Sequence, residues 1–128
     1  MNYKYKKIQF LLPFFILFGP APLFAGEELS AEDVKSLVIG NTISATNLMK
    51  DFHFKVYFDS DGSTAFRSQG GEMTKTAYEF KGSKHCIYWK GKNRCANILK
   101  NDDGSYTRVN KKGKHVVQWT EIVKGNQL

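Results

Sequence analysis

The residues of this chain that are best suited to binding a ligand are cations and aromatic rings within one short stretch. No acidic residue interrupts positions 80–94, where the candidate partner-binding residues are Lys84, Tyr88, Trp89, Lys90, Lys92 and Arg94. Cations beside aromatic rings can grip polyanions, glycans or an acidic protein cleft. We therefore predict that an unknown protein or an anionic component of the cell envelope binds here, rather than a specific nucleic acid. The alternative is that lysines at hairpin tips only keep strands apart and soluble.

The sequence offers little for catalysis or metal binding. Three histidines, His53, His85 and His115, lie on separate predicted strands without metal-ligand spacing, so we interpret them as solvent-facing or strand-end residues. The run Asp59-Ser60-Asp61-Gly62 lacks the later ligands of a calcium loop and predicts a turn. No G-x-S-x-G motif is present. We expect a protein that is not an enzyme and that uses neither a metal nor a cofactor.

Cys86 and Cys95 predict a disulfide, provided that the chain reaches an oxidising compartment. If Lys90-Gly91 is the two-residue tip of a hairpin, Cys86 falls opposite Cys95 at a non-hydrogen-bonded position, where Cα atoms lie ~4.5 Å apart. Such a bridge stabilises by about 2–3 kcal/mol on the loop-entropy model. The spacing is not C-x-x-C and no further cysteine lies nearby, which disfavours a redox or metal role.

The first 25 residues predict an export signal. Positions 4–7 carry three lysines, positions 8–18 are apolar apart from Gln9 and Pro13, and Ala25 offers a small residue for signal peptidase. A membrane span needs ~20 apolar residues, and this run is shorter and interrupted by proline. We therefore expect a periplasmic or secreted protein with no membrane span after cleavage.

The rest of the chain has the size of one domain. Removing 25 of the 128 residues leaves 103, residues 26–128, which suffices for one core and is too short for two. Three of the 19 Lys and Arg residues precede the cleavage site, so 16 face 12 acidic residues and the formal charge is +4. Such a charge suits solubility and weak attraction to anionic surfaces. Besides the first cluster, the cations include a second group around a later turn: Arg108, Lys111, Lys112 and Lys114. We expect a monomer.

One short helix and about seven strands are predicted. Ser30 can cap a helix over Ala31–Ile39, which Gly40 would end. Runs of alternating polarity or of residues that favour strands, bounded by glycine turns, predict seven strands. They lie at 52–58, 74–80, 84–89, 93–100, 105–110 and 115–123, with one more that begins at about residue 64. Such short turns make sequence neighbours pair. The predicted fold is mainly β: an antiparallel meander forming a curled sheet or a small lipocalin-like barrel, with the helix plugging an end or covering an edge.

Two hairpins predict which side chains share a face. A three-residue loop ending at Gly62 would pair Val56 with Phe66 and place Phe66 beside the other phenylalanines, whereas a two-residue loop would put Arg67 there. In the second hairpin the cysteines lie on the face opposite Trp89. Either the bridge is on the outer surface, or a bulge shifts the register.

The aromatic content, 14% of the chain, allows two interpretations. The rings could line a lipocalin-like cavity for a small apolar ligand, or fill a solid core, which we favour because small barrels usually have room only for side chains. The leading hypothesis is therefore a non-enzymatic binding domain. Its sharpest form is an inhibitor of a secreted hydrolase, whose rigid hairpin enters an acidic cleft; the alternative is a carrier of a small apolar ligand.

Several short motifs occur in a characteristic order. They are Gly40-Asn41-Thr42 after the helix, Asp61-Gly62, then Cys86, Trp89 and Cys95, then Asp103-Gly104-Ser105-Tyr106, and finally Gly125-Asn126. This order resembles a family of small exported proteobacterial proteins of unassigned function, over nearly the whole of residues 26–128. The resemblance implies a periplasmic β-rich domain, and it carries no catalytic residues.

Overall fold

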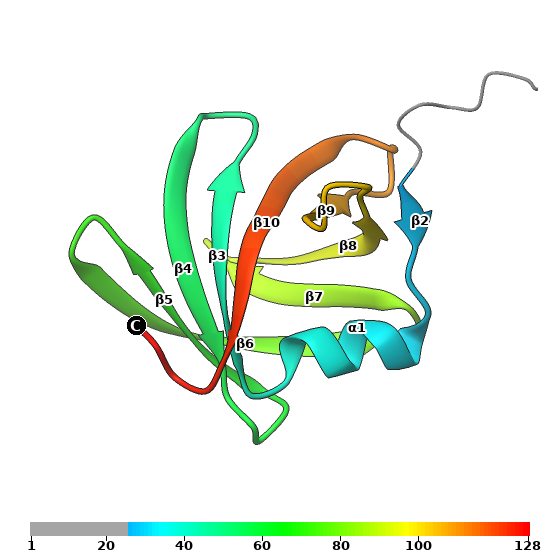
Figure 1. The fold of residues 1–128 in the computed structure, drawn as a ribbon. Coiled ribbons are helices and arrows are strands. Elements are labelled where there is room, and N and C mark those ends of the chain that lie inside the picture. Colours follow the sequence, from blue (N-terminus) through cyan, green and yellow to red (C-terminus); the bar gives the residue numbers. More distant parts are fainter. Residues whose placement is uncertain (1–25) are drawn as a thin grey trace, which may run out of the picture.

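The computed structural model describes residues 26–128, which form a closed antiparallel β-barrel with one short helix (Figure 1). The predicted export signal lies outside the described residues. The barrel strands are β3 (Asn41–Asn47), β4 (Phe52–Phe58), β5 (Thr64–Gln69), β6 (Glu72–Lys81), β7 (Lys84–Trp89), β8 (Lys92–Lys100), β9 (Tyr106–Val109) and β10 (His115–Lys124). Each pairs with the next along the chain, and β10 pairs with β3 to close the barrel. The predicted mainly β meander is confirmed, in its barrel form.

The sequence prediction missed one barrel strand, β3. Its inward residues Ile43 and Ala45 alternate with Thr42, Ser44 and Thr46, so the difference in hydrophobicity between its two faces is small. The structure nevertheless places β3 between β4 and β10, and the N–H and C=O groups of its backbone form hydrogen bonds with both neighbours. A further two-residue strand, β2 (Glu27–Glu28), adds to the edge of β8.

The helix α1 (Ala31–Val38) lies across one end of the barrel (Figure 1). The Ser30 side chain caps it as predicted, by accepting a 3.2 Å hydrogen bond from a backbone N–H of the first turn. The chain leaves the helix through Gly40, whose φ of 80° is left-handed and whose N–H donates to the Phe58 carbonyl at 2.7 Å. Val34 and Val38 are fully buried against the barrel interior. The helix therefore plugs an end of the barrel.

Side chains fill the inside of the barrel. The buried core comprises Leu29, Val34, Val38, Ile43, Ala45, Val56, Phe58, Ala65, Tyr78, Ile98 and Trp119. Burial, with smaller contributions from Asp61 and Asp59, raises the pKa of Tyr78 to about 12, and its hydroxyl donates to the Asp59 carbonyl at 2.6 Å. This packing agrees with the predicted solid core.

The predicted pairing of Val56 with Phe66 is wrong, because Val56 faces Arg67. The β4–β5 loop is longer than predicted: residues 60–63 are closed by a 2.8 Å backbone hydrogen bond between the residues that flank them. A threonine hydroxyl and two backbone N–H groups donate to the Asp61 carboxylate inside this loop, and these bonds lower the pKa of Asp61. The resulting register turns Arg67 into the barrel and Phe66 away from it.

Candidate binding surface at one end of the barrel

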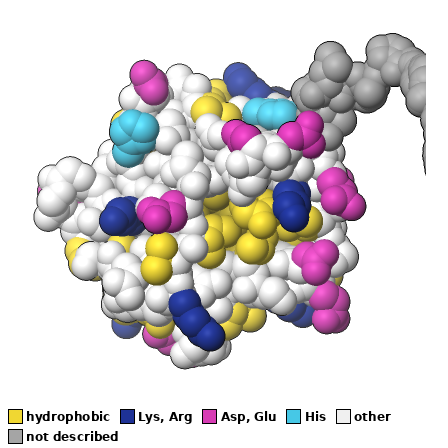
Figure 2. All heavy atoms as spheres, viewed as in Figure 1, with side chains coloured by type: hydrophobic (Ala, Val, Ile, Leu, Met, Phe, Trp, Pro, Cys, Tyr) yellow, Lys and Arg dark blue, Asp and Glu magenta, His cyan; other side chains and the backbone are white. Residues whose placement is uncertain are grey.

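The meander sorts charged residues to the two ends of the barrel. Because neighbouring strands run in opposite directions, the turns at 48–51, 70–71, 90–91 and 110–114 lie together at what we call the basic end. Its exposed cations are Lys50, Lys90, Lys92, Arg94, Lys111, Lys112 and Lys114, and its acidic residues are Asp51 and Glu72. The opposite end, which we call the helix end, carries the acidic residues Glu27, Glu28, Glu32, Asp33, Asp59, Asp61, Asp102 and Asp103, together with the cations Lys35, Lys81, Lys84, Lys100 and Lys124. Figure 2 shows acidic side chains along the edge formed by β2 and α1.

The six predicted binding residues do not form one continuous surface. Trp89, Lys92 and Arg94 share the face of the β7–β8 hairpin that turns toward the barrel axis. Tyr88 lies on the outer face, where it is 50% exposed. Lys84 begins β7 at the helix end, so it lies apart from the rest of the set. The cations and rings that alternate in the sequence therefore lie on two different faces of the hairpin.

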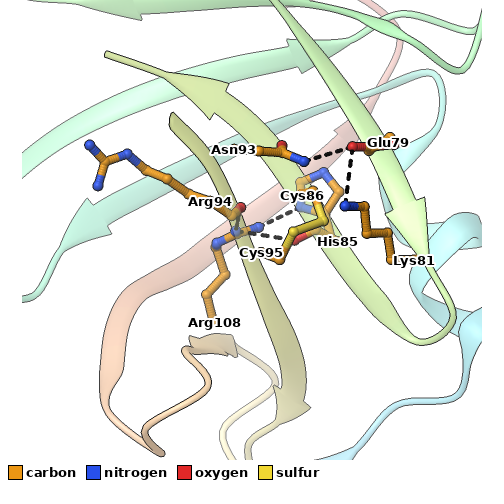
Figure 3. The surroundings of a disulfide bond; sticks show 8 residues. All are labelled: Glu79, Lys81, His85, Cys86, Asn93, Arg94, Cys95 and Arg108. Atoms are coloured by element: carbon orange, nitrogen blue, oxygen red, sulfur yellow. Dashed lines mark hydrogen bonds and ion pairs between the residues drawn. A yellow bond between two sulfur atoms is a disulfide. The ribbon is translucent and has the colours of Figure 1, made fainter. Parts of the chain in front are cut away.

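The disulfide joins this hairpin on its outer face (Figure 3). Cys86 pairs directly with Cys95 at a Cα–Cα distance of 3.9 Å, and the register runs along the hairpin without a bulge. The predicted bridge is confirmed, and the unbroken register places it on the face of the hairpin opposite Trp89, although the Cys86 side chain is fully buried there. Glu79 of the neighbouring strand pairs with Cys86 and accepts a 2.7 Å hydrogen bond from Asn93, while the Arg94 side chain points away from the bridge (Figure 3).

The tip of this hairpin is a tight two-residue turn. Lys90 and Gly91 both have positive φ, 51° and 77°, as a type I′ turn requires. Glycine adopts this conformation freely, whereas a lysine there is strained. The turn holds the ammonium-bearing residue Lys90 at the outermost point of the hairpin.

Arg67 lies inside the barrel beside this hairpin. Its guanidinium carbon is 3.8 Å from the ring centroid of Phe54 and 4.3 Å from that of Trp89, so the two rings stack on the planar group. One nitrogen, Nη2, donates to Gln69 Oε1 at 2.9 Å, whereas Nε is buried without a hydrogen-bond partner. Burial lowers the pKa of Arg67 to about 10, which leaves it charged at neutral pH. The sequence prediction did not include Arg67 in the site.

Arg108 and His85 form a second buried polar group, so the predictions of a surface role for Arg108 and of a solvent-facing His85 are wrong. Strand pairing turns both inward, where Arg108 Nη1 bonds His85 Nδ1 and Nη2 donates to the carbonyls of His85 and Arg94 at 3.2 and 3.0 Å. Since arginine only donates, Nδ1 accepts and the imidazole proton is on Nε2, near the rings of Phe58 and Trp119. Burial, followed by the charge of Arg108, holds the pKa of His85 well below 6.5, and burial lowers the pKa of Arg108 to about 10.

Two hollows open at the surface. One, of about 380 Å³, lies along β3, β4 and the end of β5 and is lined by polar side chains that include Ser44, His53 and Lys55. The other, of about 360 Å³, lies between α1 and β10. Its floor contains Tyr106 and Trp119, and Figure 2 shows apolar side chains reaching the surface in the middle of this face. Neither hollow includes Arg67 in its lining.

Other kinds of site find no support in the described residues. Within 26–128, no three His, Cys, Asp or Glu side chains come close enough together to hold a metal ion. No helix in that part of the chain is long and apolar enough to cross a membrane. Comparisons with protein-family models, with curated proteins and with solved structures found no match.

Proposed function

We propose that this protein is a non-enzymatic binding domain that acts after export and engages an anionic partner through the basic end of the barrel. The observation that supports this most strongly is that the cation-bearing turns 90–91 and 110–114 lie at the same end, where cations outnumber acidic residues, while acidic residues outnumber cations at the other end. Such a separation of charge orients a protein toward an anionic surface and speeds association. The disulfide fits an oxidising compartment, where such bridges persist.

The favoured partner is an acidic protein surface, and in the sharpest form the acidic cleft of a secreted hydrolase. The β7–β8 hairpin is held on its outer face by the Cys86–Cys95 bridge and on its inner face by the stacking of Trp89 on Arg67. A hairpin that is already rigid loses little conformational entropy when it binds. It would enter a cleft with Lys90 leading.

Titrations with two anionic polymers test this proposal. Poly-L-glutamate represents an acidic protein, and dextran sulfate represents an anionic polymer of the cell envelope. We expect poly-L-glutamate to bind the oxidised protein at low salt and to bind far more weakly at about 0.5 M salt, where exposed charges are screened. If only dextran sulfate binds, the partner is an anionic polymer of the envelope and not a protein. If neither polymer binds at low salt, the proposal is contradicted.

A second candidate, a carrier of a small apolar ligand, is favoured by the hollow between α1 and β10. Leu37, Tyr106, Trp119 and Ile122 give it an apolar lining, and a closed barrel is compatible with carriage. The filled interior weighs against a deep ligand, because a ligand would have to displace packed side chains. Saturable one-to-one binding of an uncharged naphthyl dye, with quenching of Trp119 fluorescence, would favour the carrier.

A further inference from the structure

We infer that Arg67 anchors a carboxylate-binding site at the mouth of the barrel, on the inner side of the β7–β8 hairpin. This inference rests on the proposed function and deepens it, because it names the chemical group of the partner that is bound. The carboxylate has two possible sources, an acidic side chain of a protein or a free small molecule. The experiment below separates them.

Arg67 is a buried charge without a counter-charge among the described residues. Arg67 is only 8% exposed, and its contacts are the aromatic rings of Phe54, Trp89 and, at 6.0 Å, Phe52, together with the neutral amide of Gln69. Among residues 26–128 no carboxylate forms an ion pair with it. Buried cations are costly unless they are paired. An incoming anion would supply the missing charge.

One edge of the Arg67 guanidinium keeps an N–H group without a partner. The ring centroids of Phe54 and Trp89 lie 3.8 and 4.3 Å from the guanidinium carbon, so we place the ligand at the edge of the planar group. That edge carries the unpartnered Nε–H and the Nη2 group that now donates to Gln69. Two parallel N–H donors in one plane match the two oxygens of a carboxylate.

A neutral side chain now occupies this edge of the guanidinium. Gln69 is exposed and ends β5, immediately before the Gly70-Gly71 turn. Its amide oxygen accepts one hydrogen bond from Arg67, as one oxygen of a carboxylate would. We interpret Gln69 as an occupant that a carboxylate displaces to reach the buried Nε.

The charged side chains beside this edge are positive. Lys92 and Arg94 share the inward face of the hairpin with Trp89, and Arg94 Nε donates to the Trp89 carbonyl at 3.1 Å. Two further cations beside the mouth favour an anionic ligand and disfavour a cationic one. The site thus combines one specific pair of N–H donors, on Arg67, with the positive charge of the basic end.

Nuclear magnetic resonance of the oxidised protein tests the site, with the Arg67 Nε–H and the Trp89 indole N–H as reporters. The probes are acetate and a hexaglutamate peptide, at low salt. We expect the Arg67 Nε–H signal to shift on titration, and Arg67→Met to weaken the binding that causes the Trp89 shift by about tenfold or more. Arg67→Lys, which keeps the charge without the planar donor pair, should restore little of it. Gln69→Ala should tighten binding, a result that a purely structural Arg67 would not produce.

Each outcome separates this inference from the proposed function. Shifts with both probes mean that a carboxylate from either source is bound, and shifts with the peptide alone identify a protein side chain. If the peptide binds but the Arg67 Nε–H signal stays unchanged, the inference is overturned and the proposed function stands. If neither probe binds, both fail. Should Arg67→Met not fold, the wild-type Nε–H signal and Gln69→Ala decide the question.

Discussion

Trp89 stacks on Arg67, with 4.3 Å between the indole ring centroid and the guanidinium carbon. The residue before the basic turn is thereby fixed to the barrel interior, while Cys86 and Cys95 join the same two strands on the outer face. The orientation of the Lys90 tip is therefore determined from both sides of the hairpin. Because the tip is already rigid, it loses little conformational entropy when it binds a partner.

Removing the disulfide should lower the free energy of unfolding without changing the fold. For the double variant Cys86→Ala/Cys95→Ala we expect a loss of about 2–3 kcal/mol, because the open loop of the unfolded chain regains its entropy. Urea unfolding of the variant and of the reduced wild-type protein measures this loss. An unchanged urea midpoint after reduction would show that the bridge does not stabilise the barrel.

Lys90→Asn should stabilise the protein and weaken its binding of poly-L-glutamate. Asparagine tolerates the positive φ of this turn position better than lysine, which predicts a gain of about 0.5–1 kcal/mol. Lys92→Asn is the matched control, since it removes the same charge from a strand position where asparagine gains nothing. Equal changes in stability in the two variants would refute the turn argument.

Arg108→Leu should destabilise the barrel strongly. The substitution leaves His85 Nδ1 without a donor and removes the guanidinium bonds to the carbonyls of His85 and Arg94, at a cost of about 3 kcal/mol in unfolding free energy. The exposed change Lys124→Ala serves as the control and should stay within about 0.5 kcal/mol of the wild type. A loss for Arg108→Leu no larger than that of the control would mean that these contacts contribute nothing.

Stability should fall as the pH drops below 6.5. His85 has a depressed pKa in the folded barrel, so the unfolded chain binds the extra proton first. The free energy of unfolding then decreases as the pH falls from about 6.5 toward the depressed pKa of the folded state, with a slope approaching ~1.4 kcal/mol per pH unit. Urea unfolding at a series of pH values should show this slope in the wild type and lose it in His85→Gln. A slope that survives the substitution must come from other groups.

The sequence predicts the strands well where hydrophobic alternation is strong and turns are short. The bounds predicted for β4 and β7 agree with the structure, and the two-residue turn at Lys90-Gly91 fixed the pairing of the cysteines correctly. The strand β3 was missed because its alternation between small residues gives little contrast. Closure of the barrel depends on that strand, so the sequence left open the choice between a curled sheet and a barrel.

The candidate site could be predicted only in part. The basic hairpin was found from its composition, but Arg67, Arg108 and His85 were not expected inside the barrel, because polar residues are usually exposed. Their orientation is set by register, and a register that differs by one residue exchanges the two faces of a strand. The length of the β4–β5 loop decided whether Phe66 or Arg67 turned inward, and the hydrogen bonds of Asp61 that hold this loop are not visible in the sequence.

The most direct test of the proposed function compares the two ends of the barrel. The triple variant Lys90→Gln/Lys92→Gln/Arg94→Gln removes three cations from the basic end. Its matched control, Lys35→Gln/Lys81→Gln/Lys100→Gln, removes three from the helix end. We would measure the affinity of each oxidised protein for poly-L-glutamate at low salt. We expect a loss of about tenfold or more for the basic-end variant and little change for the control. Equal losses in both would show that only net charge matters, and would contradict a binding surface at the basic end.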